Sequence, residues 1–177
     1  GVVNPAMLNV VNNVAVASAG SLTIGTGGPA LSTVKAINMT TAGSTSVLAR
    51  GRVNLTGQLT QSAGTLNLNG GVIDAFSVIS QAGTFNATGD INANVTIGNG
   101  VGATATLAPG ALLEIDGNLK LAPDSRLEVE FRPGTGGGVF DRIDVTGTIT
   151  LGGVLDLSIL SGATPVEGAT YTILSAD

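Results

Sequence analysis

Apolar residues occupy every second position in several short stretches between Phe140 and Asp177. The alternating pairs are Ile143 and Val145, Ile149 and Leu151, Leu155 and Leu157, and Tyr171 and Ile173. Successive side chains of a β-strand point to opposite faces, so this alternation gives each strand one apolar face. Glycines stand where the alternation pauses, as turn residues do. The pattern predicts a run of short strands with one buried face.

A corner of small residues followed by an alternating stretch recurs along the chain. Two clear copies are Ala63-Gly-Thr-Leu66-Asn-Leu68 and Ala82-Gly-Thr-Phe85-Asn-Ala87. The corners begin at residues 19, 42, 63, 82, 102 and 122. A spacing of about twenty residues is too long for a hairpin and too short for a propeller blade, and it is typical of one coil of a β-solenoid.

A second alternating stretch follows most corners. Its members are Val53 and Leu55, Phe76 and Val78, the odd positions from Ile91 to Ile97, and Leu113 and Ile115. Each coil is therefore expected to contain at least two short strands, stacked in parallel on those of the next coil about 4.8 Å away. No stretch keeps a helical apolar spacing over three turns, and even Ala6 to Val16 is expected to be strand. The predicted fold class is all-β, a parallel β-helix.

Composition favours the same fold. Only 11% of the residues are charged, against about a quarter in a typical soluble domain. The core must be built mainly from Val, Ile, Leu and Ala, because the large rings are few: Phe76, Phe85, Phe131, Phe140 and Tyr171. Such a thin core suits a solenoid, in which each layer buries only a few side chains against its neighbours.

The charge pattern changes near Pro109 and Gly110. Residues 1–110 contain three basic and two acidic residues, whereas residues 111–177 contain four basic and ten acidic ones. We expect residues 1–110 to form the regular coils and residues 111–177 to form a charged C-terminal capping sheet of the same solenoid. An uncovered end coil would expose unpaired backbone groups, and a polar terminal repeat prevents this. The glycine-rich segment 133–138 predicts a mobile loop.

Several classes of function are disfavoured. The chain has no Cys and no His, so it lacks thiolate metal ligands and the commonest general base. A pI near 4.4 argues against nucleic-acid partners. No apolar run is long enough for a transmembrane helix. The chain starts at Gly1 without a basic leader, and we expect it to be a mature product or a piece of a longer protein.

Acidic residues provide the candidate catalytic groups. Three pairs lie two or three residues apart: Glu114 with Asp116, Glu128 with Glu130, and Asp141 with Asp144. Glycoside hydrolysis uses two carboxylates about 5 to 10 Å apart, and a spacing of two along one strand face gives about 6 to 7 Å. Solvated strand faces have the same spacing, and basic residues are interleaved with these acids. We therefore favour a solvated face and predict no catalytic residue.

Other candidate sites also have a structural interpretation. Arg50 and Arg52 are assigned to a solubilising strand edge rather than to a polysaccharide site. Calcium could bind oxygen ligands of Asp141, Asp144 or the segment 90–92, but no calcium-binding loop motif is present, so neither a metal nor a cofactor is expected.

A glycine-rich segment and a set of asparagines are also assigned structural roles. The segment Gly98-Asn-Gly-Val-Gly102 has no helix signal and no Lys-Ser/Thr after it, so it predicts a turn and not a phosphate loop. Asparagines are expected to form stacked amide ladders along the rod. They are Asn67, Asn69, Asn86, Asn92 and Asn94.

From Ala105 onward, four phrases carry a family resemblance. They are Leu107-Ala-Pro-Gly-Ala, then Leu119-Lys-Leu-Ala-Pro-Asp-Ser-Arg-Leu-Glu-Val-Glu, then Asp141-Arg-Ile-Asp-Val-Thr-Gly-Thr-Ile-Thr-Leu-Gly-Gly-Val-Leu-Asp-Leu, and Gly168-Ala-Thr-Tyr-Thr-Ile-Leu. This region resembles the C-terminal passenger (autochaperone-like) region of bacterial autotransporters and is similar to surface proteins with autotransporter-associated β-strand repeats. The resemblance implies a right-handed parallel β-helix whose C-terminal part caps the rod and helps the passenger to fold. It implies structural roles for Asp144, Gly147, Gly152, Gly153, Leu155, Gly168 and Tyr171.

The expected function is therefore structural and non-enzymatic: the β-helical stem and cap of a secreted or surface-displayed bacterial protein. Its expected partner is the rest of the parent polypeptide, and its expected location is extracellular or at the bacterial cell surface. One alternative is a β-helix that binds or cleaves polysaccharides, with cell-surface glycans as partners. A second alternative is a self-assembling surface subunit that binds like subunits.

Overall fold

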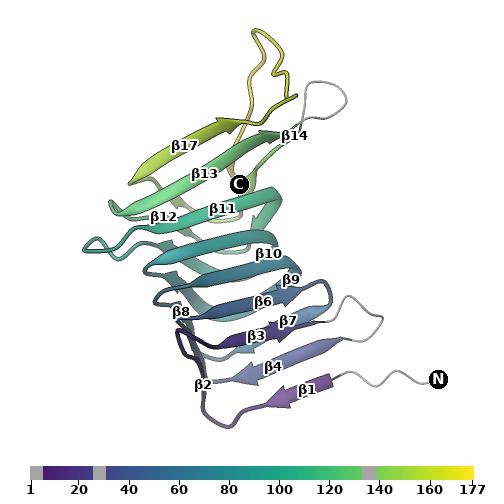
Figure 1. Cartoon of the computed structure of the whole chain (residues 1–177), viewed down its shortest axis with the longest axis vertical. Helices are drawn as coiled ribbons and strands as arrows, with labels where there is room; N and C mark the ends of the chain where they lie inside the picture. The colour runs from purple at the N-terminus through teal and green to yellow at the C-terminus, as the bar shows by residue number, and fades with distance from the viewer. Residues whose placement is uncertain (1–5, 26–30, 133–138) are drawn as a thin grey trace, which may run out of the picture.

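The computed structural model describes residues 6–25, 31–132 and 139–177, and all their regular elements are β-strands. The strands are β1 (Ala6–Asn9), β2 (Asn13–Val16), β3 (Ser21–Ile24), β4 (Ser32–Ala36), β5 (Asn38–Thr41), β6 (Ser44–Leu48), β7 (Gly51–Leu55), β8 (Gln58–Gln61), β9 (Thr65–Ser80), β10 (Gly83–Ile97), β11 (Ala105–Ile115), β12 (Leu119–Leu121), β13 (Ser125–Arg132), β14 (Val139–Phe140), β15 (Ile143–Val145), β16 (Ile149–Thr150), β17 (Val154–Ile159) and β18 (Leu174–Ala176). Figure 1 shows them stacked along one rod. No described residue belongs to a helix that could cross a membrane.

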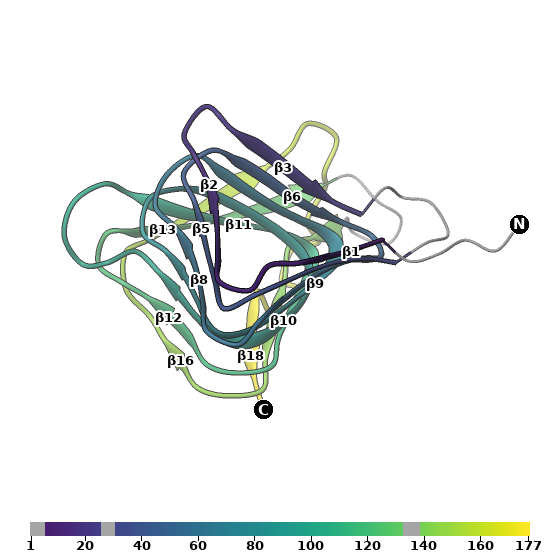
Figure 2. The same cartoon turned by 90° about the horizontal axis from the view of Figure 1, so that it is seen from below.

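Each coil has three strands, and the coils enclose a roughly triangular interior (Figure 2). The first face stacks β1, β4, β7, parts of β9, β10 and β11, then β15 and β18. The second face stacks β2, β5, β8, later parts of β9 and β10, then β12 and β16. The third face stacks β3, β6, the first parts of β9, β10 and β11, then β13 and β17.

These stacked pairs are parallel, which confirms the predicted parallel β-helix. Stacked residues in the middle of the rod lie about one predicted period apart: Asn67 and Asn86 are separated by 19 residues. The coils lengthen towards the C-terminus, where Asn118 and Thr148 are separated by 30 residues. Strand β11 runs through Gly110, so the change in charge at that residue does not coincide with a break in the solenoid.

Apolar side chains form continuous columns inside the rod. On the third face one column, here called the leucine column, joins Leu66, Phe85, Leu107, Leu127 and Leu155. Its first four members are at most 3% exposed. The alternation seen in the sequence therefore places one residue of each coil directly above its counterpart in the coil before.

Two expectations about individual segments have clear outcomes. The stretch from Ala6 to Val16 forms β1 and β2, as expected. Phe76 was expected to point inward, but its side chain is 75% exposed. The register shows why: β9 has one residue more than β10 at this corner, since Asp74 pairs with Asn92 and Ser77 pairs with Asn94. The predicted mobile loop at 133–138 lies outside the described residues.

The structure does not confirm the predicted C-terminal cap. Strand β17 pairs with β13 along one edge, and no described strand pairs with its other edge. Leu155 and Leu157 of β17 are each 53% exposed. Strand β17 therefore continues the interior columns but leaves them uncovered at this end.

Candidate functional site

A groove with a volume of about 490 Å³ runs along the third face and is here called the amide groove. It crosses β6, β9, β10, β11 and β13, so several successive coils contribute to it. It is lined by Ser46, Leu48, Asn67, Leu68, Asn69, Asn86, Ala87, Thr88, Ala108, Pro109, Gly110, Glu128, Glu130, Arg132 and Asp141. Because outward side chains repeat from coil to coil, chemically similar groups recur along its length.

Stacked amides form part of the wall of the amide groove. The Nδ2 of Asn86 donates to the Oδ1 of Asn67 at 2.7 Å, and the Nδ2 of Asn67 donates to the Oγ of Ser46 at 3.4 Å. This confirms the predicted ladder for these two asparagines. On the other faces, Asn92 donates instead to a carboxylate oxygen of Asp74, and Asn94 accepts from the amide of Asn118.

A buried carboxylate closes one end of the amide groove. Asp141 is 1% exposed and accepts hydrogen bonds from the backbone N–H of Glu130 at 3.0 Å and from Arg132 at 2.5 Å. Burial raises the pKa of Asp141 above its ordinary value of 3.8, and the Glu130 and Arg132 bonds oppose this shift without overcoming it. Arg132 also bonds Glu130. This end of the groove is therefore a compact cluster of two acids and one base.

The three acidic pairs have different positions. Glu128 and Glu130 both line the amide groove, so the i,i+2 spacing does place them on one face. Asp141 also lies there, whereas Asp144 lines a second groove on the first face. The hypothetical pair of Asp141 and Asp144 is therefore wrong, because the chain turns a corner between them.

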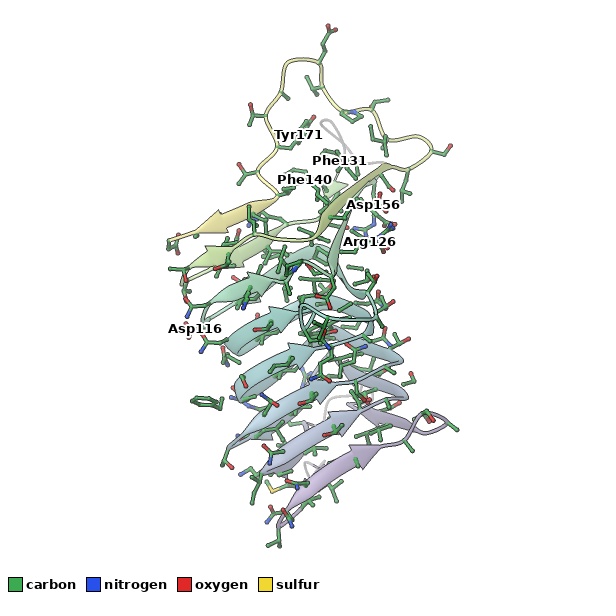
Figure 3. The ribbon with its side chains drawn as sticks, turned by 90° about the vertical axis from the view of Figure 1, so that its left-hand side faces the viewer. Asp116, Arg126, Phe131, Phe140, Asp156 and Tyr171 are labelled. Atoms are coloured by element: carbon green, nitrogen blue, oxygen red, sulfur yellow. The ribbon has the colours of Figure 1, made fainter. Side chains whose placement is uncertain are left out.

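The second groove, here called the acidic groove, also has a volume of about 490 Å³. It is lined by Asp90, Asn92, Glu114, Ile115, Asp116, Asp144, Val145, Thr146, Ser175 and Asp177. Glu114 and Asp116 lie in it as a pair, and Asp116 lies at the edge of the molecule in Figure 3. Parallel pairing stacks Asp90, Glu114 and Asp144 in one outward row.

Two of the five acids of this groove, Asp116 and Asp144, have side-chain hydrogen-bond partners. Asp144 accepts from Arg142 at 2.8 Å and from Ser175 at 2.5 Å. Asp116 accepts from Thr146 at 2.9 Å. Within residues 6–25, 31–132 and 139–177, no three acidic side chains are arranged to hold a metal ion. The residues considered for calcium are thus divided between two grooves.

The two arginines of the first half lie in different settings. Arg52 of β7 forms an ion pair with Asp74 of β9 through Nε and Nη2. The assignment of Arg52 to a strand edge is wrong, because β7 is paired with β4 on one side and with β9 on the other. Arg50 occupies the preceding turn with a φ of 63°. Arg52 thus links neighbouring coils within the first face.

The glycine-rich segment from Gly98 to Gly102 is a turn, as predicted, and strand β11 follows it. The carboxylate of Asp124 accepts the N–H of Gly100 at 2.9 Å and the N–H of Asn99 at 3.2 Å. The Gly100 bond is the main cause that lowers the pKa of Asp124 below 3.8. In a phosphate loop such backbone N–H groups would bind a phosphate. Here they donate hydrogen bonds to an aspartate of the next coil.

The residues to which the resemblance gives structural roles lie around the last coils. A Cβ on Gly147 would lie 2.5 Å from the side-chain oxygen of Asn118, and one on Gly152 would lie 2.6 Å from the carbonyl oxygen of Leu121. Gly153 has a φ of 71°, and its Cβ would meet the carbonyl oxygen of Ser125. These glycines allow the last coil to pass close to the one below it.

The remaining members of that set are less tightly packed. Gly168 has a φ of 78° but nothing within 4 Å of an added Cβ. Tyr171 contacts Phe131 and Phe140, with ring centroids 4.9 and 5.3 Å away (Figure 3). Its hydroxyl accepts the backbone N–H of Val166 at 2.7 Å. This aromatic cluster anchors the long segment between β17 and β18.

Sequence reasoning missed three features of these sites. It did not pair Arg132 with Asp141, place Asp124 in the glycine turn, or join Arg126 of β13 to Asp156 of β17, which lie 2.6 Å apart (Figure 3). The partners of Asp124 and Arg126 lie one coil away, and Arg132 meets Asp141 across the antiparallel β13–β14 pair. A register of the late, longer coils would have been needed to find them.

Comparisons of the chain with protein-family models, with curated proteins and with solved structures find no match. The function must therefore be argued from the geometry of the chain and from the resemblance of its C-terminal phrases.

Proposed function

We propose that this chain is a structural, non-enzymatic stem of a secreted or surface-displayed bacterial protein. Its work is to hold other parts of the parent polypeptide at a distance along a rigid rod and to support their folding. The observation that carries this proposal is the leucine column, whose members Leu66, Phe85 and Leu107 are completely buried in successive coils. A continuous dry column makes each coil depend on its neighbours, as a rod requires.

The outward side chains support the same proposal. Much of their hydrogen-bonding capacity is used between coils, as in the Asn67–Asn86 amide pair and the Arg126–Asp156 ion pair. Exposed ion pairs contribute only about 0 to 1 kcal/mol each to stability. They therefore stabilise the stacked coils less than the buried apolar columns do. The bacterial, surface-displayed setting rests on the resemblance of the C-terminal phrases to autotransporter passengers.

Removing one complete coil tests whether the chain behaves as a stem. Because Thr84 stacks on Thr65, deleting residues 65–83 joins Gly64 to Thr84 in register and should leave a shorter rod that unfolds cooperatively. The matched control deletes residues 65–84, which shifts the alternation by one residue and turns apolar side chains outward. Far-UV circular dichroism and urea unfolding should separate the two variants. Unfolding of both variants, or equal stability, would contradict a modular stem.

A second candidate function is the binding or cleavage of polysaccharides in the amide groove. The specific observation is the run of amides that ends at buried Asp141 and the partly exposed side chains of Arg132 and Glu130. Amide and carboxylate groups are suitable partners for sugar hydroxyls. A glycan array and a reducing-sugar assay, each repeated on Asp141→Asn, test this alternative. If the unmodified chain binds glycans and Asp141→Asn does not, the result would favour polysaccharide binding over a purely structural stem.

A further inference from the structure

A break in strand pairing opens the amide groove between β11 and β13. The parallel pairs of these two strands end at Leu107 and Leu127, although β13 continues beyond that point. Pro109 in β11 has no backbone N–H with which to extend the ladder. Glu130 bonds Asp141 in place of β11: its N–H donates to the carboxylate, and its carbonyl accepts the N–H of Asp141. The groove therefore has an opening between two coils, and Asp141 closes one end of it.

The residues of β11 in this opening have short side chains. In the outward column that contains Asn67 and Asn86, the next residue is Ala108. Each amide of the column bonds the coil before it, as Asn86 donates to the Oδ1 of Asn67. The methyl group of Ala108 has no donor for the Oδ1 of Asn86, and Gly110 at the next outward position adds no side chain. The ladder therefore stops with an amide acceptor at the edge of the opening.

The β13 side of the opening has more acids than bases. The residues that line the groove include three acids and one base, and the base, Arg132, is shared by Glu130 and Asp141. Glu128 lies 3.8 Å from Arg126, whose closer ion pair, at 2.6 Å, is with the following coil. The side chains of Glu128 and Glu130 are 42% and 41% exposed, so a ligand can reach both. Ionised carboxylates and amide oxygens accept hydrogen bonds, so both sides of the opening suit a ligand that donates them.

We propose, on the basis of the polysaccharide-binding candidate above, that this opening binds an amino sugar: a sugar ring with a free ammonium group, in a linear oligosaccharide. The ammonium donates charge-assisted hydrogen bonds to Glu128, and a ring hydroxyl donates to the Oδ1 of Asn86. The C–H face of the ring lies on Ala108 and Gly110. The groove volume of about 490 Å³ is within the range of about 300 to 1,000 Å³ that small-ligand sites have.

The same chemistry disfavours other ligands. A uronic acid would bring its own carboxylate against Glu128. A neutral sugar would leave the excess negative charge of the β13 side without a partner. A lysine side chain carries an ammonium but has no hydroxyl for Asn86. An amino sugar supplies both the positive charge and the hydroxyl donors.

Titration calorimetry of the intact 177-residue chain tests this ligand. The probes are oligomers of glucosamine, N-acetylglucosamine and galacturonic acid with equal length, and a lysine oligomer, at a mildly acidic pH that keeps the sugar amine protonated. The glucosamine oligomer should bind about tenfold or more tightly than the acetylated one, which has lost the charge. The galacturonic acid oligomer should not bind. Absence of glucosamine binding, equal affinity for the acetylated oligomer, tighter binding of the acidic oligomer, or equal affinity for the lysine oligomer overturns the proposal.

Two variants locate the site. Ala108→Asn adds the missing amide of the column, whose Nδ2 can donate to Asn86, and it fills the opening without changing charge. It should abolish glucosamine binding. Its matched control, Thr106→Asn, changes an outward position of the same strand outside the groove and should bind like the unmodified chain. Unchanged binding by Ala108→Asn, or loss of binding in Thr106→Asn, would show that the ligand lies elsewhere and would overturn the proposal.

A second pair of variants tests the charge. Glu128→Gln should weaken glucosamine binding about tenfold and leave the acetylated oligomer unaffected. Glu114→Gln removes the same charge from the acidic groove and should affect neither. An equal effect of both variants would reduce the recognition to overall charge and would contradict the proposed contact. Far-UV circular dichroism verifies each fold, and Glu128→Gln remains decisive if Ala108→Asn does not fold.

The outcomes distinguish this ligand from the broader functions. If the acetylated oligomer binds as tightly as the glucosamine oligomer and Ala108→Asn abolishes both, the groove binds polysaccharides but the amino-sugar preference is wrong. The proposed stem is tested separately by the coil deletion, and its result does not depend on any glycan.

Discussion

Leu107 and Leu155 occupy the same interior column and differ in what covers them. Leu107 is fully buried between Phe85 and Leu127, whereas Leu155 stacks on Leu127 and has no described residue above it. Changing either leucine to alanine removes the same atoms. The difference between the two changes in the free energy of unfolding therefore measures the contribution of a covering coil.

The structure sets the two magnitudes. Truncating a fully buried leucine costs about 3 to 5 kcal/mol, because a cavity adds to the lost transfer free energy. Leu107→Ala should fall in this range, since hydrogen-bonded strands on both sides prevent the coils from collapsing into the cavity. Burying a leucine side chain fully contributes about 1.5 to 3 kcal/mol. Leu155 is about half buried and leaves no enclosed cavity, so Leu155→Ala should cost about 1 kcal/mol.

Equilibrium urea unfolding followed by far-UV circular dichroism measures both values. The slope of free energy against urea concentration should be unchanged in the variants, which shows that the same surface unfolds. Equal costs for the two substitutions would refute the column. So would a cost below about 1.5 kcal/mol for Leu107→Ala.

Four further substitutions test local features. Gly153→Ala should destabilise the fold by more than about 2 kcal/mol, because the positive φ of Gly153 and the carbonyl of Ser125 both oppose a Cβ. Gly168→Ala should cost only about 1 kcal/mol, because nothing lies near the added Cβ. Thermal unfolding measures both changes in stability. Burial raises the pKa of Asp141, so between pH 3.8 and the raised pKa the folded chain binds more protons than the unfolded chain does. The stability of the unmodified chain relative to Asp141→Asn should therefore fall as the pH rises through this range. The pKa of Asp124 is lowered, so its contribution is present above pH 3.8 and is lost as the pH falls through the folded pKa. Urea unfolding of Asp124→Asn across acidic pH should therefore show a dependence opposite in sign to that of Asp141→Asn. A dependence of the same sign would contradict one of the two assignments, and the direction that both share identifies which one.

The strand alternation was sufficient to predict the parallel β-helix and most of its interior. Leu66 and Phe85 were placed inward from their spacing alone, and both are completely buried. Their separation also gave the period of the middle coils. This worked because the inward and outward positions of a stacked strand follow directly from a period of two.

Corners could not be predicted in the same way. Alternation describes a straight strand, and it says nothing about how many residues a corner takes. One additional residue in β9 moves Phe76 from the expected interior to the surface. The corner between Asp141 and Asp144 likewise sends two neighbouring acids to different grooves. Errors in the predicted sites therefore arise at corners, where chain direction changes within two or three residues.

The C-terminal end shows a different limit of sequence patterns. The charges after residue 110 suggested a polar cap, but in the structure Arg126 pairs with Asp156 and Arg132 pairs with Asp141. Both pairs lie on the sides of the rod and leave the interior of the end coil uncovered. Alternation shows that one face of β17 is apolar, but it cannot show whether another coil lies above it. The last strands therefore act as a template for parallel pairing, because the unpaired backbone groups of β17 and its half-exposed leucines would be stabilised by any strand that stacks on them.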